Sequence, residues 1–253
     1  MRQSNAYVLL FSGVMTIILG GALSLASVGL KPAQTKQIEL DTKKKILGAV
    51  MDISNLKTGE EVLALYDKRF KSVVVDINGN PVEKDAKGNP LIAEKIDIQK
   101  NHKVAKEERN YPVFMFLDEN DPSKVIAYVF PMFGSGLWDW ISGYMALDGD
   151  LNTIKGVAFD HKSETPGLGA RITTPEIQGR YVGKEIFENG DLVSVTMVKG
   201  ESGKPQDAHH VDGMSGATLT GKGVNAMLEN YLSSYTAFIK KQKSASGQSA
   251  MAF

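Results

Sequence analysis

The chain contains no cysteine in its 253 residues and only four histidines. The lack of cysteine excludes thiolate catalysis, disulfide bonds, cysteine-ligated iron–sulfur clusters and cysteine-type zinc sites. Lys plus Arg and Asp plus Glu both number 29, so the formal net charge of zero gives no support to a nucleic-acid partner. With 42% hydrophobic and 23% charged residues, most of the chain can still fold as an ordinary globular body.

A metal site finds little support in the few histidines. His161 and Glu164 lie close together, but no third ligand follows at helical spacing. His209 and His210 lie in a polar segment near Asp207, which is typical of surface histidines. We therefore predict no metal site.

Charged residues are also missing near the start of the chain. Residues 3–30 contain none, and residues 6–30 form a run of 25 apolar or small residues. A helix of that length is about 37 Å long, which exceeds the roughly 30 Å hydrocarbon core of a bilayer. A cleaved secretory signal ending near residues 24–26 is the alternative. Because the run is longer than a usual signal core, the pattern favours a retained membrane anchor over residues 1–33.

One face of this anchor carries small residues at intervals of three or four positions: Gly13, Thr16, Gly20, Ser24 and Ser27. Small residues in line allow a second helix to approach closely in lipid. The pattern is compatible with a partner helix, although Gly and Ser are common in such segments in any case.

Residues 34–110 are expected to link the anchor to the body. Lys31-Pro32 is expected to end the first helix, and an amphipathic helix is predicted over residues 35–52. Thr58 and Glu61 form a capping-box pattern that opens a second helix. The polar, Lys-rich stretch that follows is expected to be mostly loop, with weak strands over residues 91–98.

Residues 111–243 carry the patterns of a folded domain. We expect strands over 111–118, 124–132 and 192–200, a hairpin over 141–162, a short helix from Thr174-Pro175 and a long final helix. Residues 244–253 are small and polar and are expected to form a flexible tail. The predicted fold class is α+β: one N-terminal transmembrane helix and a soluble mixed α/β domain with an antiparallel-rich sheet.

Two short segments of this domain combine glycine with an aromatic or apolar side chain. The segment GSGLWDW, residues 134–140, contains Trp138, for which simple packing is the plainest interpretation. In HKSETPGLGARI, residues 161–172, Gly167 and Gly169 flank Leu168 in a loop after a strand. Such a loop allows backbone N–H groups to approach a ligand, although its spacing is not that of a dinucleotide-binding fingerprint.

A third segment, DGMSGATLTGKG, places three hydroxyls at the entrance of the final helix. The start of a helix has free N–H groups and a partial positive charge, which favour a phosphate. A phosphate esterified to Thr220 would be stabilised there, with Ser215 and Thr218 adding hydroxyl contacts. Asp212 is unfavourable beside an anion and is better explained as a turn former, an N-cap or a group used by a modifying enzyme. An ordinary capped helix is the alternative.

Taken together and in this order, the three segments resemble the FMN-binding domain family in which a threonine receives FMN through a phosphoester bond. The matched pattern D-x-x-S-G-A-T-x-T comprises Asp212, Ser215, Gly216, Ala217, Thr218 and Thr220. With its N-terminal membrane helix, the chain resembles the C-subunit family of the sodium-translocating NADH:quinone reductase. The G subunits of Rnf-type electron-transport complexes carry the same motif and are the alternative. The long, loop-rich segment over residues 78–110 makes the chain larger than is expected of the Rnf G subunits.

The resemblance implies that Thr220 carries FMN, attached by a flavin transferase that uses FAD and a magnesium ion. It also implies that the cofactor is bordered by a further set of motif residues: Trp138, Glu164, Thr165, Leu168 and Gly169. The expected role is electron relay within a membrane complex that includes a second flavin-bearing subunit and an iron–sulfur centre. The chain itself shows no NADH site, quinone cavity or sodium pathway, and we predict no catalytic side chain.

The resemblance places the protein in the bacterial inner membrane, with its soluble domain on the periplasmic side. The positive-inside rule, applied to Arg2 before the helix and to Lys31, Lys36 and residues 43–45 after it, favours the opposite side. We follow the resemblance. A cofactor-free, membrane-anchored assembly module is the remaining alternative, and it would hold if the third segment were only a helix cap.

Overall fold

The computed structural model describes residues 4–250, and the chain divides into two units, residues 1–41 and 42–253. The first unit is formed by most of helix α1 (Asn5–Val50), whose last residues belong to the second unit. Arg2, which entered the charge count across the membrane, lies outside the described residues.

Helix α1 is continuous over 46 residues and contains Pro32 in its interior. The expected break at Lys31-Pro32 and the separate helix over residues 35–52 were therefore wrong. Proline removes one hydrogen bond and costs about 3 kcal/mol in a helix interior, but the helix continues on both sides of Pro32. The apolar part has a mean hydropathy of 2.2, so the helix is long and apolar enough to cross a membrane.

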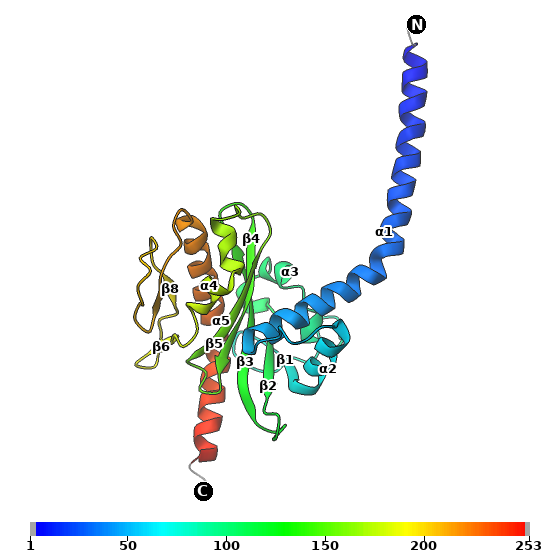
Figure 1. Ribbon diagram of the computed structural model, residues 1–253. Helices are drawn as coiled ribbons and strands as arrows, with labels where there is room; N and C mark the ends of the chain where they lie inside the picture. Colours follow the sequence, from blue (N-terminus) through cyan, green and yellow to red (C-terminus); the bar gives the residue numbers. More distant parts are fainter. Residues whose placement is uncertain (1–3, 251–253) are drawn as a thin grey trace. The chain divides into compact units, whose positions relative to one another are not determined.

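The second unit is built on a five-stranded antiparallel sheet (Figure 1). Its strands follow the chain in order: β1 (Phe70–Val75), β2 (Tyr111–Leu117), β3 (Val125–Ser135), β4 (Trp140–Asp148) and β5 (Ile154–His161). The expected α+β fold with an antiparallel-rich sheet is confirmed. Because β1 pairs with β2, the segment 34–110 contributes an edge strand to the same sheet as the segment 111–243.

Short helical elements lie before β1 and in the connection between β1 and β2. Helix α2 (Gly59–Arg69) precedes β1 and begins with the expected capping box of Thr58 and Glu61. After β1 come η1 (Ala93–Lys95), α3 (Ile98–His102) and η2 (Lys106–Glu108). The expected weak strands over residues 91–98 were wrong, because local capping prevails there: the Asp97 carboxylate accepts the N–H of Lys100 and starts α3.

The region between β5 and the last helix consists of short elements. They are η3 (Gly169–Thr173), α4 (Pro175–Gly179), β6 (Phe187–Glu188), β7 (Asp191–Leu192), β8 (Thr196–Met197) and β9 (His210–Val211). Helix α4 begins at the expected Thr174-Pro175. The single strand expected over residues 192–200 is divided, because Ser194 adopts a left-handed φ of 61° between β7 and β8.

Helix α5 (Thr218–Ala250) packs on the sheet, mainly along β3 (Figure 1). Its buried stripe is the one that the sequence predicts: Val224, Met227, Leu228, Tyr231, Leu232, Tyr235 and Phe238. The ring of Tyr235 lies 4.7 Å from that of Phe130 and 5.5 Å from that of Tyr111. The helix continues through residue 250, so residues 244–250 are helical, and residues 251–253 lie outside the described residues.

Candidate functional site

Three loops meet at the start of α5. The first connects β3 to β4, the second follows β5, and the third leads from β9 into α5. Glycine makes the close approach of α5 to β3 possible, since a Cβ on Gly134 would lie 2.8 Å from the Cβ of Met227. A Cβ on Gly223 would likewise collide with the carbonyl oxygen of Ser135. The fold therefore brings together the three segments that the sequence singled out.

Glu164, in the second loop, binds both the first loop and the start of α5. Its Oε2 atom accepts a hydrogen bond of 2.6 Å from the Thr220 hydroxyl. Its Oε1 atom accepts the backbone N–H groups of Leu137 at 2.8 Å and Trp138 at 3.1 Å. The side chain is only 4% exposed, so each carboxylate oxygen is held by specific donors.

Thr220 is the third residue of α5 and is 1% exposed. Gly169 lies directly over its hydroxyl: an added Cβ would be 2.5 Å from the Thr220 Oγ and would also collide with the Glu164 carboxylate. A Cβ on Gly136 would collide with the same carboxylate. Both glycines thus leave space for the hydrogen-bonded pair of Glu164 and Thr220.

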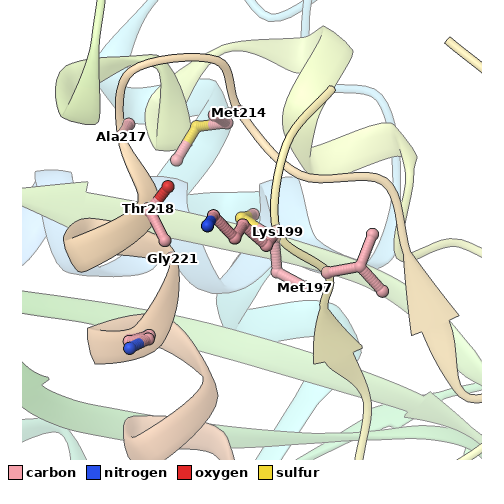
Figure 2. A pocket seen from close by; sticks show the side chains of 8 residues that line it. Met197, Lys199, Met214, Ala217, Thr218 and Gly221 are labelled. Carbon is pink, nitrogen blue, oxygen red and sulfur yellow. The ribbon is translucent and has the colours of Figure 1, made fainter. Parts of the chain in front are cut away.

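Thr218 lies in a different environment, although it is only two residues away. Two positions along a helix correspond to a rotation of about 200°. Thr218 lines a small cavity of about 90 Å³ together with Met197, Val198, Lys199, Met214, Ala217, Gly221 and Lys222 (Figure 2). Ligand pockets are typically about 300–1,000 Å³. A cofactor of FMN size attached near the start of α5 would therefore lie outside this cavity.

Large apolar side chains remain exposed around the site. Trp138 is 68% exposed, and its indole N–H donates to the Thr165 hydroxyl at 3.2 Å. Leu137, Leu168 and Leu219 are exposed as well. Gly216 has a left-handed φ of 73°, and a Cβ there would lie 2.8 Å from the Leu168 side chain. Exposed apolar groups from the first two loops and from the start of α5 make a surface that suits a ligand or a partner.

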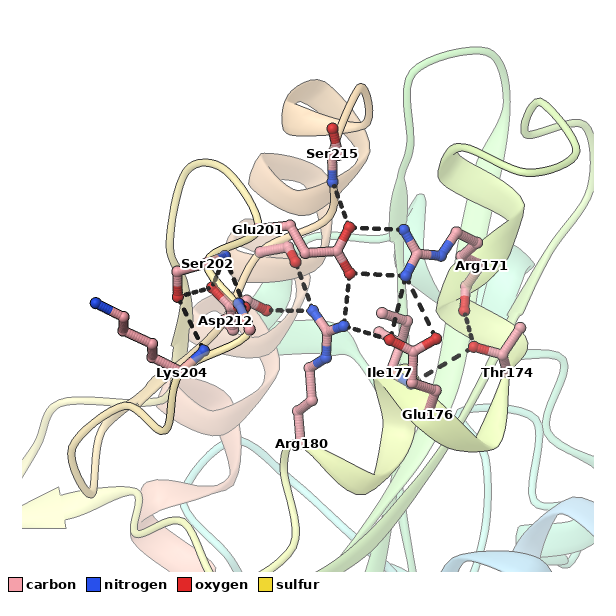
Figure 3. A network of polar contacts seen from close by, with 12 residues as sticks. Arg171, Thr174, Glu176, Ile177, Arg180, Glu201, Ser202, Lys204, Asp212 and Ser215 are labelled. Carbon is pink, nitrogen blue, oxygen red and sulfur yellow. Dashed lines mark hydrogen bonds and ion pairs between the residues drawn. The ribbon is translucent and has the colours of Figure 1, made fainter.

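A second carboxylate, Glu201, fixes the third loop (Figure 3). It accepts two hydrogen bonds from the Arg171 guanidinium, at 2.7 and 2.8 Å, and one from Arg180 at 2.6 Å. It also accepts the backbone N–H of Ser215 at 3.0 Å. The hydrogen bonds from Arg171 and then Arg180 hold the pKa of the Glu201 carboxyl well below its usual range. Arg180 in turn donates to the carbonyl oxygen of Gly213, so the loop is tied at two points.

Asp212 does not cap α5, so that part of the expectation was wrong. Its carboxylate accepts the N–H of Ser202 at 2.9 Å, the N–H of Gly203 at 2.7 Å and the Ser202 hydroxyl at 2.9 Å. These hydrogen bonds, that of the Ser202 backbone first, lower the pKa of Asp212. The carboxylate therefore secures the preceding loop, because its acceptor positions are occupied by residues 202 and 203.

Sequence reasoning missed Arg171, Arg180 and Glu201. Arg171 lies within the second segment, so its position gave a signal, whereas Glu201 lies in an unremarkable polar stretch. His161 and Glu164 stabilise the second loop, since the Nδ1 atom of His161 accepts the backbone N–H of Glu164 at 3.2 Å. Among the described residues, no group of three or more His, Asp or Glu is placed to hold a metal ion.

The model of the FMN-binding domain family matches residues 136–233, a span that includes all three loops. The C subunit of the Na(+)-translocating NADH-quinone reductase of Pseudomonas aeruginosa is 34% identical over an alignment of 245 residues, and the match covers 91% of this chain and 92% of that protein. The corresponding protein of Neisseria meningitidis is 31% identical, and the match covers 94% of this chain and 96% of that protein.

Solved structures agree with these relatives. A crystal structure of the C subunit from Parabacteroides distasonis is 37% identical, with a TM-score of 0.68 over 83% of this chain and 96% of that one. NqrC of Shewanella oneidensis is 28% identical, with a TM-score of 0.69 over 82% of this chain and 99% of that one. The site thus lies in an FMN-binding domain, and the chain belongs to the C-subunit family of the Na(+)-translocating NADH-quinone reductases. The expected resemblance to this family, and to a component of an oxidoreductase complex, is confirmed.

Proposed function

We propose that Thr220 carries FMN through a phosphoester bond, and that the protein relays electrons as a component of a sodium-pumping NADH:quinone reductase. The observation that carries this proposal is the position of the Thr220 hydroxyl, at the point where three loops of an FMN-binding domain meet. The names of the relatives support the assignment to the reductase complex.

The residues around Thr220 fit FMN. The exposed side chains of Trp138, Leu168 and Leu219 offer an apolar surface for a flavin ring. The first turn of α5 has backbone N–H groups without intrahelical partners, and these groups favour a phosphate. FMN, when bound, supplies a redox centre that exchanges electrons singly or in pairs, while the chain attaches and positions it.

The family and α1 together support a membrane-anchored protein. We propose that α1 holds the soluble domain on the periplasmic side of the bacterial inner membrane. Residues 3–30 contain no charged side chain, so the apolar part of α1 serves as an anchor and offers no charged group for a sodium path.

The electron partners are proposed to be other membrane subunits, including a second flavin-bearing subunit and an iron–sulfur centre. Because this chain has no cysteine, an iron–sulfur centre ligated by cysteine has to belong to a partner. A flavin transferase that uses FAD and magnesium is the partner during maturation.

The two threonines of α5 give a direct test of the attachment site. The full chain is produced together with a flavin transferase, denatured, and examined for flavin fluorescence in a gel and for the mass of the peptide that contains Thr220. We expect a fluorescent band in the wild type and in Thr218→Ala, and none in Thr220→Ala. Equal fluorescence in Thr220→Ala would overturn the site. An unmodified wild-type peptide would leave a membrane-anchored assembly module as the better explanation.

A further inference from the structure

Glu164 is placed to act on the Thr220 hydroxyl during its modification. We propose that Glu164 accepts the Thr220 proton when the flavin phosphate is transferred, so that the acceptor chain supplies the base for its own flavinylation. This inference rests on the proposed attachment at Thr220 and concerns how that bond is made.

The geometry is that of an activated hydroxyl nucleophile. Such sites place a base within hydrogen-bond reach of the nucleophile and orient the base with a third group. Here the Glu164 Oε2 lies 2.6 Å from the Thr220 Oγ. The other oxygen is held by the N–H groups of Leu137 and Trp138, which orient the carboxylate. Oε2 is therefore turned towards the hydroxyl proton.

The charge environment supports the same role. Among the described residues, no lysine, arginine or histidine side chain forms an ion pair with Glu164. Its hydrogen-bond donors are two backbone N–H groups and one hydroxyl, which are all neutral. A carboxylate buried for structural reasons alone is usually paired with a cation. Glu164 instead directs its second oxygen at a nucleophile.

The transfer step balances without a redox change. The Thr220 Oγ forms a bond to the flavin-side phosphorus of FAD, and the bond from that phosphorus to the bridging oxygen breaks. AMP leaves with the electron pair of the broken bond. The proton of the Thr220 hydroxyl passes to the Glu164 Oε2 and from there to solvent.

Access to Thr220 requires a local movement, since Gly169 covers the hydroxyl. The segment 165–169 therefore has to be displaced before a transferase can reach Thr220. Glu164 precedes that segment and is fastened to the first loop through Leu137 and Trp138. Because these two bonds do not involve the displaced segment, we expect the carboxylate to stay beside Thr220 when the segment moves.

The test measures the initial rate of flavin incorporation into the purified full chain, with a purified flavin transferase, FAD and Mg²⁺. Incorporation is followed by fluorescence after denaturation and by the mass of the Thr220 peptide. We expect Glu164→Gln to lower the maximal rate by about 100-fold or more, as for loss of a general base, with little change in the half-saturating FAD concentration. The control Glu188→Gln removes the same charge from an exposed position of β6 and should react like the wild type.

A second variant separates proton transfer from a purely structural role. Glu164→Asp retains a carboxylate on a shorter side chain, whereas Glu164→Gln retains the shape and the acceptor for Leu137 and Trp138. We expect Glu164→Asp to be flavinylated faster than Glu164→Gln, and the two melting temperatures show whether both variants fold. A wild-type rate in Glu164→Gln, or a slower rate in Glu164→Asp than in Glu164→Gln, would overturn the proposal. If wild-type Thr220 itself remained unmodified, the proposed attachment would fail first.

Discussion

Glu164 and Glu201 are two carboxylates that both contact the third loop or the start of α5, but their partners differ in charge. Glu201 accepts hydrogen bonds from two guanidinium groups and from a backbone N–H. Glu164 accepts only from neutral groups, one of which is the Thr220 hydroxyl. The comparison teaches that the two carboxylates differ in their partners: paired charge fixes the loop at Glu201, whereas Glu164 has no ion pair among the described residues and faces the Thr220 hydroxyl, for which we proposed the chemical role.

The largest effect after substitution of Glu164 itself is expected for Gly169→Ala. A Cβ at this position would collide with Glu164 and lie 2.5 Å from the Thr220 Oγ, so it would push the pair apart. We expect a loss of stability of about 1–3 kcal/mol, typical of overpacking, together with greatly reduced flavinylation. Denaturant unfolding and flavin fluorescence measure the two effects. The control Gly179→Ala, where nothing lies within 4 Å of the added Cβ, should leave both unchanged.

For Glu201→Gln we expect a loss of stability without a loss of flavinylation. This substitution weakens the hydrogen bonds to Arg171 and Arg180. Hydrogen bonds to charged groups contribute about 1.5–3 kcal/mol, and the Glu201 side chain is 20% exposed, so we expect a loss near the lower value. Flavinylation at saturating FAD should remain within a few-fold of the wild type. A collapse of the flavinylation rate in a folded Glu201→Gln protein would contradict the separation of tasks between the two carboxylates.

Acid should affect the structural carboxylates in a predictable direction. The pKa values of Glu201 and Asp212 are lowered in the folded protein, by hydrogen bonds from Arg171 and from the Ser202 backbone first. Each contribution is therefore present above the unfolded value, 4.5 for Glu201 and 3.8 for Asp212, and is lost as the pH falls through the folded value. We expect the free energy of unfolding to decrease below about pH 4.5, less steeply in Glu201→Gln. Equal slopes in the two proteins would argue against the Glu201 network.

The smallest effect on stability is expected for Trp138→Phe. The indole is 68% exposed and donates one hydrogen bond of 3.2 Å to Thr165. Exposed substitutions of this kind usually change stability by less than about 0.5 kcal/mol. Because the backbone N–H of residue 138 still donates to Glu164, flavinylation should persist. A large loss of flavinylation in Trp138→Phe would contradict this expectation and would show that the indole itself, and not only the backbone N–H, takes part in the reaction.

Sequence patterns predicted much of the fold because the relevant signals are local. Apolar runs on either side of a turn located β2 and β3, and the apolar stripe located α5. The predictions failed where a local rule met a competing effect. Pro32 did not end α1, and the left-handed Ser194 divided an expected strand. The three motif segments were identified from sequence, but the hydrogen bond from Thr220 to Glu164 joins residues 56 positions apart, and no local pattern reports it.

The sequence by itself determined the apolar anchor segment, the antiparallel α+β character, the family and the segment that contains Thr220, since these depend on composition, periodicity and short motifs. Only the tertiary structure decided which hydroxyl lies against a buried carboxylate and which lines a cavity. It also decided that the carboxylate of Glu201, and not that of Asp212, accepts hydrogen bonds from the Arg171 and Arg180 side chains. The physical reason is that these contacts arise between loops brought together by the packing of α5 on the sheet, where glycine at a few positions permits an approach that any Cβ would prevent.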